Sequence, residues 1–224
     1  MPEVDPESLA ATLTSPGGRH HPERWINGLK HPALPPRPTR WVRPRETDPL
    51  PFPRECQLNP FLAHSQFGQA PIMWDVGLDL GTILFNTEDE ICIPLGKADH
   101  HQPATFPFVT HMCINAVSDD PTPKFPWPML IRNASGIKCE DVYAGIHDNF
   151  QEYVSREELT TLFSWVRREQ AFRALELRRR AQELRGEEPD RWLRRIDYFG
   201  MHVMFRGLEP NPNCEGWILF MGLG

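Results

Sequence analysis

Apolar and polar positions alternate in several short segments after residue 70, and these segments predict strands. In FVTHMCINAV, residues 108–117, neither alternating face is purely polar, so we expect a strand in the centre of a sheet. In WPMLIRNAS, residues 127–135, Pro128 has no N–H to donate and restricts the strand to a sheet edge or a bulge. Weaker strands are predicted at 71–77, 81–87, 196–205 and 216–222, and residues 90–108 are expected to be rich in loops.

Two consecutive helices are predicted by a different spacing. Apolar residues recur every four positions in residues 139–154, at Val142, Ile146, Phe150 and Val154. A second helix is expected to begin at Ser155, because Glu158 three residues later completes a capping box. An unbroken helix over residues 155–185 would be about 45 Å long, so we expect a break or a protruding end.

The order of strands, two helices and further strands is typical of an α+β domain with a mainly antiparallel sheet. We assign this domain to residues 58–224. Residues 1–57 form a separate Pro-rich arm, since 13 of the 24 prolines fall in the first sixty residues and favour extended backbone.

The arm carries apolar anchors at intervals: Trp25, Trp41 and Phe52. Such composition buries little apolar area, so a disordered tail is one interpretation. The spaced aromatic residues favour a second, in which the arm docks on its own domain or on a protein partner, including another copy of the chain. Both remain open at this point.

Composition and charge exclude some classes of binding partner and indicate a cellular location. The formal charge of −6 argues against nucleic acid, and no apolar segment approaches the length of a membrane span. The N-terminus lacks the basic and apolar regions of a secretory signal. Five widely spaced cysteines are typical of reduced thiols, so we expect an intracellular protein, cytoplasmic or nuclear. Carboxylates lie within and around the LRRRAQELR stretch at 177–185, which favours a solvated, ion-paired helix over a phosphate-binding surface. They are Glu176, Glu183, Glu187 and Glu188.

The KADHHQPATFPFVTHMC stretch, residues 97–113, contains the best candidates for a metal or hydrolytic site. If residues 97–101 form an extended loop, neighbouring side chains point to opposite sides, so at most Asp99 and His101 converge. His111 and Cys113 would share one face of the following strand. Together they could surround one ion, but the short-spaced ligand pair that zinc sites usually have is missing. A polar loop entering a central strand is the other interpretation. No cofactor is expected, because the chain has neither a nucleophile elbow nor a glycine-rich phosphate loop.

Several short motifs follow one another in a fixed order along the chain. They are Trp74-Asp75, Pro103-Ala104-Thr105 with Pro107, Pro126-Trp127, Asp141-Val142, Ser155 with Glu158, and Arg195, Asp197 and Gly200 through Phe205 and Gly207. This ordered set resembles an uncharacterised domain family of mushroom-forming basidiomycete fungi (domain of unknown function 6699), over about residues 58–222. The resemblance implies no activity and transfers no catalytic residue. Where the family has Thr before the first helix, this chain has Lys138, so a side-chain cap worth about 1 kcal/mol is missing unless another contact replaces it.

These observations favour a non-enzymatic protein-interaction or self-assembly module that acts through Trp25, Trp41 and Phe52. We expect Trp74 and Trp127 in the core. The alternative is a small-molecule, metal-binding or hydrolytic site around His101, His111 and Cys113.

Overall fold

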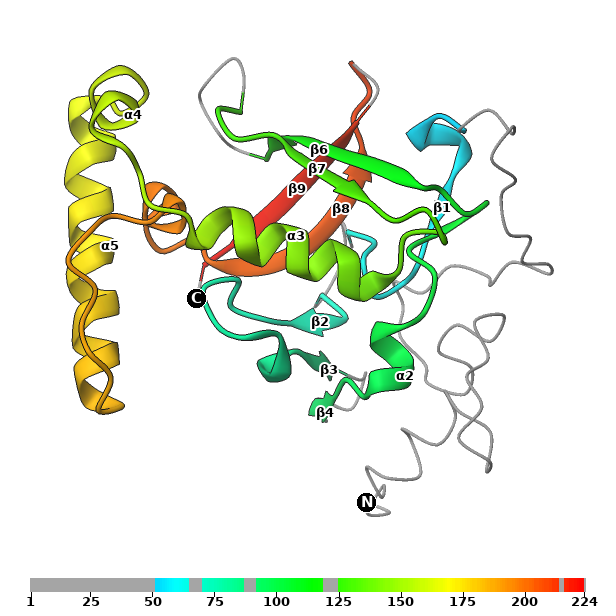
Figure 1. The fold of residues 1–224 in the computed structure, drawn as a ribbon, viewed down its shortest axis with the longest axis horizontal. Coiled ribbons are helices and arrows are strands. Elements are labelled where there is room, and N and C mark those ends of the chain that lie inside the picture. Colours follow the sequence, from blue (N-terminus) through cyan, green and yellow to red (C-terminus); the bar gives the residue numbers. More distant parts are fainter. Residues whose placement is uncertain (1–50, 65–69, 87–91, 119–124, 214–215, 224) are drawn as a thin grey trace.

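The computed structural model describes residues 51–64, 70–86, 92–118, 125–213 and 216–223 (Figure 1). Trp25 and Trp41 lie outside the described residues, and Phe52 lies inside them. The described chain forms an α+β fold, as predicted. Trp74 and Trp127 are both buried, which confirms the expectation that they belong to the core.

A four-stranded sheet in the order β7-β6-β9-β8 forms the centre of the fold. The pairs β6–β7 and β8–β9 are antiparallel, and β6–β9 is parallel. The long strand predicted within 108–117 is therefore central, and the strand after Pro128 lies at an edge, both as expected. The four strands are β6 (His111–Val117), β7 (Met129–Arg132), β8 (Met204–Pro210) and β9 (Trp217–Gly222).

Two smaller sheets complete the strands. One has the order β2-β3-β4 and the other pairs β1 with β5, all antiparallel. Asp75 joins the first of these sheets to the central sheet through an isolated bridge to Met204. Their bounds are β1 (Gln57–Leu58), β2 (Ile72–Met73), β3 (Leu84–Asn86), β4 (Cys92–Pro94) and β5 (Thr105–Phe106). The 3-10 helix η2 (Pro53–Glu55) precedes β1, and η3 (Leu80–Thr82) lies between β2 and β3.

The first predicted helix is α3 (Cys139–Gln151), which crosses the central sheet (Figure 1). Its four-residue stripe is buried at Val142, Ile146 and Phe150, because that side of the helix faces the core. Lys138 provides no side-chain cap, as predicted from the sequence. A tertiary contact satisfies a different N–H at this end: the N–H of Cys139, the first helical residue, donates to the Gln102 carbonyl at 2.9 Å.

The second predicted helix is broken in two. Ser155 and Glu158 form the expected capping box at the start of α4 (Arg156–Thr161), and Ser164 then caps α5 (Trp165–Leu184). Because a new helix starts at Ser164, α5 runs along one side of the domain as a separate element (Figure 1). No helix among the described residues is long and apolar enough to cross a membrane.

Two sequence expectations were wrong in detail. The stretch expected to be mainly loop contains β4, β5 and a single helical turn, α2 (Lys97–His100). The segment expected to approach a strand from Ile196 onwards begins instead with η4 (Arg195–Phe199). In η4 the Asp197 carboxylate accepts the Arg194 N–H at 2.8 Å, which starts a helical turn that apolar alternation does not reveal.

Candidate functional site

The predicted metal or hydrolytic residues do not converge. His101 follows α2, and its Nε2 atom lies 3.0 Å from the Glu140 carboxylate at the start of α3. His111 is exposed on β6, where its Nδ1 atom lies 2.9 Å from the Thr110 hydroxyl, and Cys113 is half-buried two residues further along the same strand. Within the described ranges, no group of three His, Cys, Asp or Glu side chains is placed to hold a metal ion. The extended-loop geometry assumed for Asp99 and His101 is replaced by the helical turn of α2.

The same stretch does contain an unusual buried carboxyl. Asp99 is 5% exposed, and its Oδ2 atom accepts the Gly96 N–H at 2.8 Å. Burial raises the pKa of Asp99 to about 6, which the hydrogen bond from Gly96 only partly offsets. Around it lie Cys139 and Tyr143, whose own pKa values are also raised by burial and by the Asp99 charge.

Asp99 is therefore expected to make stability depend on pH. The unfolded chain releases this proton near the ordinary aspartate pKa of 3.8, whereas the folded chain holds it to about pH 6, so stability falls as pH rises between these values. Asp99→Asn has no such proton to lose. The free energy of unfolding of the variant minus that of wild type should therefore rise by about 2–3 kcal/mol as the pH is raised from 4 to 7. Urea denaturation at the two pH values measures this difference, and an unchanged difference would rule out the raised pKa.

The more substantial site lies beside α5. This helix touches the body of the domain mainly through η4, with Ala171 and Leu175 on the contact side. Arg178 anchors the contact: its guanidinium binds the Asp197 carboxylate at 3.1 and 2.7 Å and Asp190 at 2.5 Å. The sequence predicted an ion-paired helix here, and Arg179 and Arg180 do pair with Glu176 at the surface. The inward pairing of Arg178 was not predicted.

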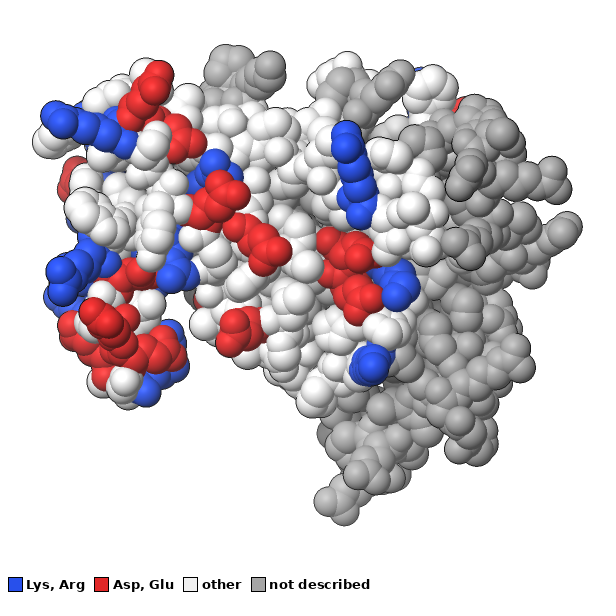
Figure 2. Space-filling model, viewed as in Figure 1, with Lys and Arg blue, Asp and Glu red and all other residues white. Residues whose placement is uncertain are grey.

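Two cavities flank this contact, and Ala174, Gly200 and Met201 line both of them. The large pocket, of about 760 Å³, lies between the C-terminal half of α5 and the body. The small pocket, of about 490 Å³, lies between the N-terminal half of α5 and the ends of β6 and β9. Together they form a groove along α5, and Figure 2 shows the hollow between the C-terminal end of α5 and the body.

The large pocket combines apolar side chains with four carboxylates and three arginines, Arg178, Arg185 and Arg194. Leu78 and Leu177 are both exposed in it. Of its four carboxylates, Asp197 pairs with Arg178, and Glu187 pairs with Arg185 at 2.6 Å. Asp75 and Asp79 form no ion pair within the part of the chain that the structure describes. Burial raises the pKa of Asp75, although the Gly77 N–H and the Arg185 charge oppose the shift.

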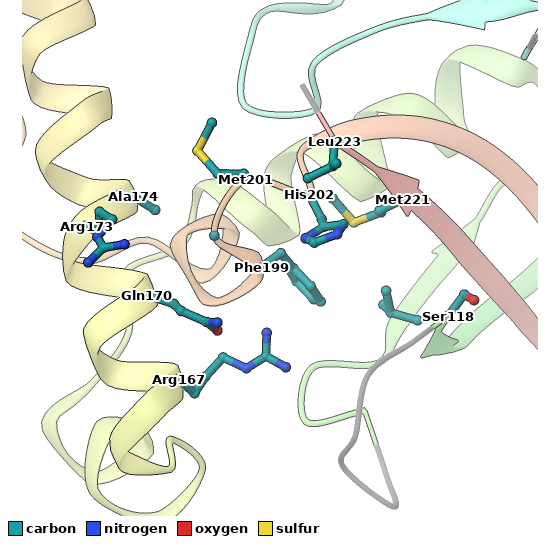
Figure 3. Close-up of a pocket in the computed structure, with 12 residues that line it drawn as sticks. Ser118, Arg167, Gln170, Arg173, Ala174, Phe199, Met201, His202, Met221 and Leu223 are labelled. Atoms are coloured by element: carbon teal, nitrogen blue, oxygen red, sulfur yellow. The ribbon is translucent and has the colours of Figure 1, made fainter.

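The small pocket is basic. Its ionisable lining side chains are Arg167, Arg173 and His202, and no Asp or Glu among the described residues lines it. Figure 3 shows Arg167 and Gln170 reaching from α5 toward Phe199 and His202 on the facing segment. The groove is therefore mixed in charge at one end and basic at the other.

Five large apolar side chains of α5 are exposed, and one of them, Leu177, lines the large pocket. In the sequence Val166, Phe172 and Leu184 continue the apolar pattern of the second predicted helix, so their exposure was not foreseen. The five are Trp165, Val166, Phe172, Leu177 and Leu184.

Phe52 is the one predicted arm anchor that the structure describes. It is 43% exposed, and the Arg54 guanidinium lies 5.5 Å from the centroid of its ring. Its N–H donates to the Glu55 carboxylate at 2.9 Å. Phe52 is therefore accessible at the point where the described chain begins.

Comparison with known proteins gives one match. The model of a family described as a family of unknown function (DUF6699) matches residues 72–215. Neither the curated proteins nor the solved structures gave a match.

Proposed function

We propose, for a chain that belongs to the DUF6699 family of unknown function, that it is a non-enzymatic self-assembly module. In this proposal residues 24–45 of one copy bind in the large pocket beside α5 of a second copy. Trp25 and Trp41 supply the apolar anchors, and Phe52 extends the contact at the end of the arm. The proposal includes an intracellular location, cytoplasmic or nuclear, which agrees with the lack of disulfides among the described cysteines.

The groove along α5 is the observation that carries the proposal. Soluble proteins rarely leave contiguous apolar surface exposed unless it is used for binding. Here Leu78, Leu177 and Met201 are all exposed around a cavity of about 760 Å³. An extended segment with a large aromatic side chain can fill such a cavity at modest entropic cost, because proline already restricts its backbone.

Charge complementarity favours the arm segment 24–45 as the ligand of the large pocket. Residues 24–45 contain six Lys and Arg and no Asp or Glu. Residues 51–224 contain 17 Lys and Arg against 24 Asp and Glu. The carboxylates of Asp75 and Asp79, which form no ion pair among the described residues, lie in the pocket itself. The arm segment and the domain therefore attract each other, and this attraction steers the aromatic anchors toward the pocket.

The position of the arm favours binding between copies. Figure 1 places η2, where the described chain begins, on the opposite side of the domain from α5. Pro51 follows Trp41 by ten residues, and ten residues of polyproline helix would span about 31 Å. A domain of this size is about 40 Å across. Trp41 therefore reaches the pocket of a neighbouring copy more readily than the pocket of its own.

Sedimentation analysis of the full chain over a range of concentrations tests the proposal. We expect concentration-dependent association that weakens as salt rises, because the attraction is partly ionic. Trp41→Ala should weaken association by about thirtyfold, the effect typical of a buried aromatic anchor. Leu177→Arg should weaken it comparably from the groove side.

A charge swap provides the sharper experiment. Asp79→Arg should weaken association, and combining it with the single arm change Arg43→Glu, which reverses the charge by the same amount, should restore part of it. Leu130→Arg is the matched control for Leu177→Arg, because Leu130 is a similarly exposed apolar residue on β7. A monomer at every concentration, or equal effects of Leu130→Arg and Leu177→Arg, would refute self-assembly through this groove.

A further inference from the structure

We propose that the small pocket is a binding site for a small apolar carboxylic acid. The carboxylate binds the Arg167 guanidinium, and the apolar body of the ligand lies against Phe199, Met221 and Leu223. This site adjoins the large pocket, with which it shares Ala174, Gly200 and Met201, but the proposed ligand binding does not depend on self-assembly.

Arg167 provides the first argument. Its guanidinium lies 4.6 Å from the centroid of the Tyr198 ring, and its Nη1 atom donates to the Tyr198 carbonyl at 3.2 Å. These contacts hold the side chain half-buried in a fixed orientation. A guanidinium has five N–H donors, and within the described ranges no carboxylate lies within ion-pair distance of Arg167. Arg173, on the same helix, has such a partner in Glu169 at 3.5 Å.

A half-buried cation without a counter-charge favours an anionic ligand, since desolvation without pairing costs free energy. The rest of the ionisable lining adds no negative charge, because Arg173 and His202 are its other ionisable side chains. Gln170 and Ser118 add neutral hydrogen-bonding groups to the rim (Figure 3). A planar carboxylate matches the fork of a single guanidinium through two parallel hydrogen bonds.

The remaining wall is apolar and defines the body of the ligand. Phe199 is buried beneath the pocket, Met221 is half-buried at the end of β9, and Leu223 is exposed at the rim. Methionine side chains adapt to ligands of different shape. The volume of about 490 Å³ lies in the range of pockets that bind small molecules. The pocket therefore fits an acyl or aryl chain that ends in one carboxylate.

Octanoate is a suitable probe, with octan-1-ol and octylamine as neutral and cationic analogues of the same length. Titration of the full chain, followed by heteronuclear NMR, should give a dissociation constant of about 0.1–1 mM for octanoate. The largest shifts should fall on amides around Arg167, Phe199 and Leu223. The neutral and cationic analogues should bind at least about tenfold more weakly.

Two variants connect binding to the site. Arg167→Met keeps the apolar stem against Tyr198 and removes the charge, and it should weaken octanoate binding by about tenfold or more. Gln170→Trp changes an exposed residue and fills the cavity from the rim, so it should abolish binding without disturbing the core. Arg180→Met, an exposed arginine on α5 that pairs with Glu176, is the control and should leave binding unchanged.

Three results would overturn the proposal: no saturable octanoate binding up to several times the expected constant, equal binding of the three probes, or equal effects of Arg167→Met and Arg180→Met. Inorganic phosphate supplies a further comparison. If phosphate alone competes fully with octanoate, the pocket recognises only an anion and the apolar part of the assignment fails.

Discussion

Arg178→Ala is expected to lower the free energy of unfolding by about 3–5 kcal/mol, because it leaves a buried carboxylate without its counter-charge. Asp197 is 3% exposed, and the Arg178 guanidinium contacts both of its carboxylate oxygens. Arg194 still supplies a charge to Asp190 in the variant, at 2.5 Å, so Asp197 carries most of the loss. Urea denaturation followed by circular dichroism measures the effect.

Two further variants separate charge from side-chain geometry. Arg178→Lys keeps the charge but loses the planar fork, so an intermediate loss is expected. Arg180→Ala removes an exposed arginine from the same helix and should change stability by less than about 0.5 kcal/mol. If Arg178→Ala behaves like Arg180→Ala, the pairing with Asp197 does not hold α5 in place.

This network also explains why α5 was only partly predictable. The apolar spacing of α3 identified a helix whose buried stripe is continuous, and the structure confirmed Val142, Ile146 and Phe150 in the core. Apolar spacing did not predict how α5 contacts the body, because the ion pair between Arg178 and Asp197 holds that helix in place. Arg178 looks like one of three surface arginines in the sequence, and its partner Asp197 lies 19 residues further along the chain.

The groove escaped prediction for a related reason. Leu177 and Leu184 have the spacing of core residues, but the body contacts the adjacent side of the helix, at Ala171 and Leu175. Which side of an amphipathic helix meets the core depends on tertiary contacts, and no local pattern contains that information. The prediction for the histidine-rich stretch, that His101 could converge with His111 and Cys113, was also wrong. It assumed an extended loop at 97–101, where the structure has the helical turn of α2. His101 therefore contacts Glu140 on α3, away from β6.

Close backbone packing is a third feature that no residue pattern measures. Gly207 lies in the segment through which the chain resembles its family, and its φ angle is +115°, a conformation that L side chains rarely adopt. The chain at residues 62–64 runs directly against it. The Leu208 N–H donates to the Leu62 carbonyl at 2.7 Å, and the His64 N–H donates to the Leu208 carbonyl at 3.0 Å.

Gly207→Ala is accordingly expected to cost about 3–5 kcal/mol of unfolding free energy. A Cβ atom at this position would lie 2.5 Å from the backbone N and Cα atoms of His64. Residues 62–64 would therefore have to move away from β8, which would lengthen their two hydrogen bonds to Leu208. Gly186→Ala is the matched control, because Gly186 also has a positive φ, +75°, but open space around its Cα. It should cost only about 1 kcal/mol, from backbone strain alone. The difference between the two variants, measured by urea denaturation, isolates the contribution of the close approach. Equal losses would mean that the segment before β2 does not pack against β8 in solution.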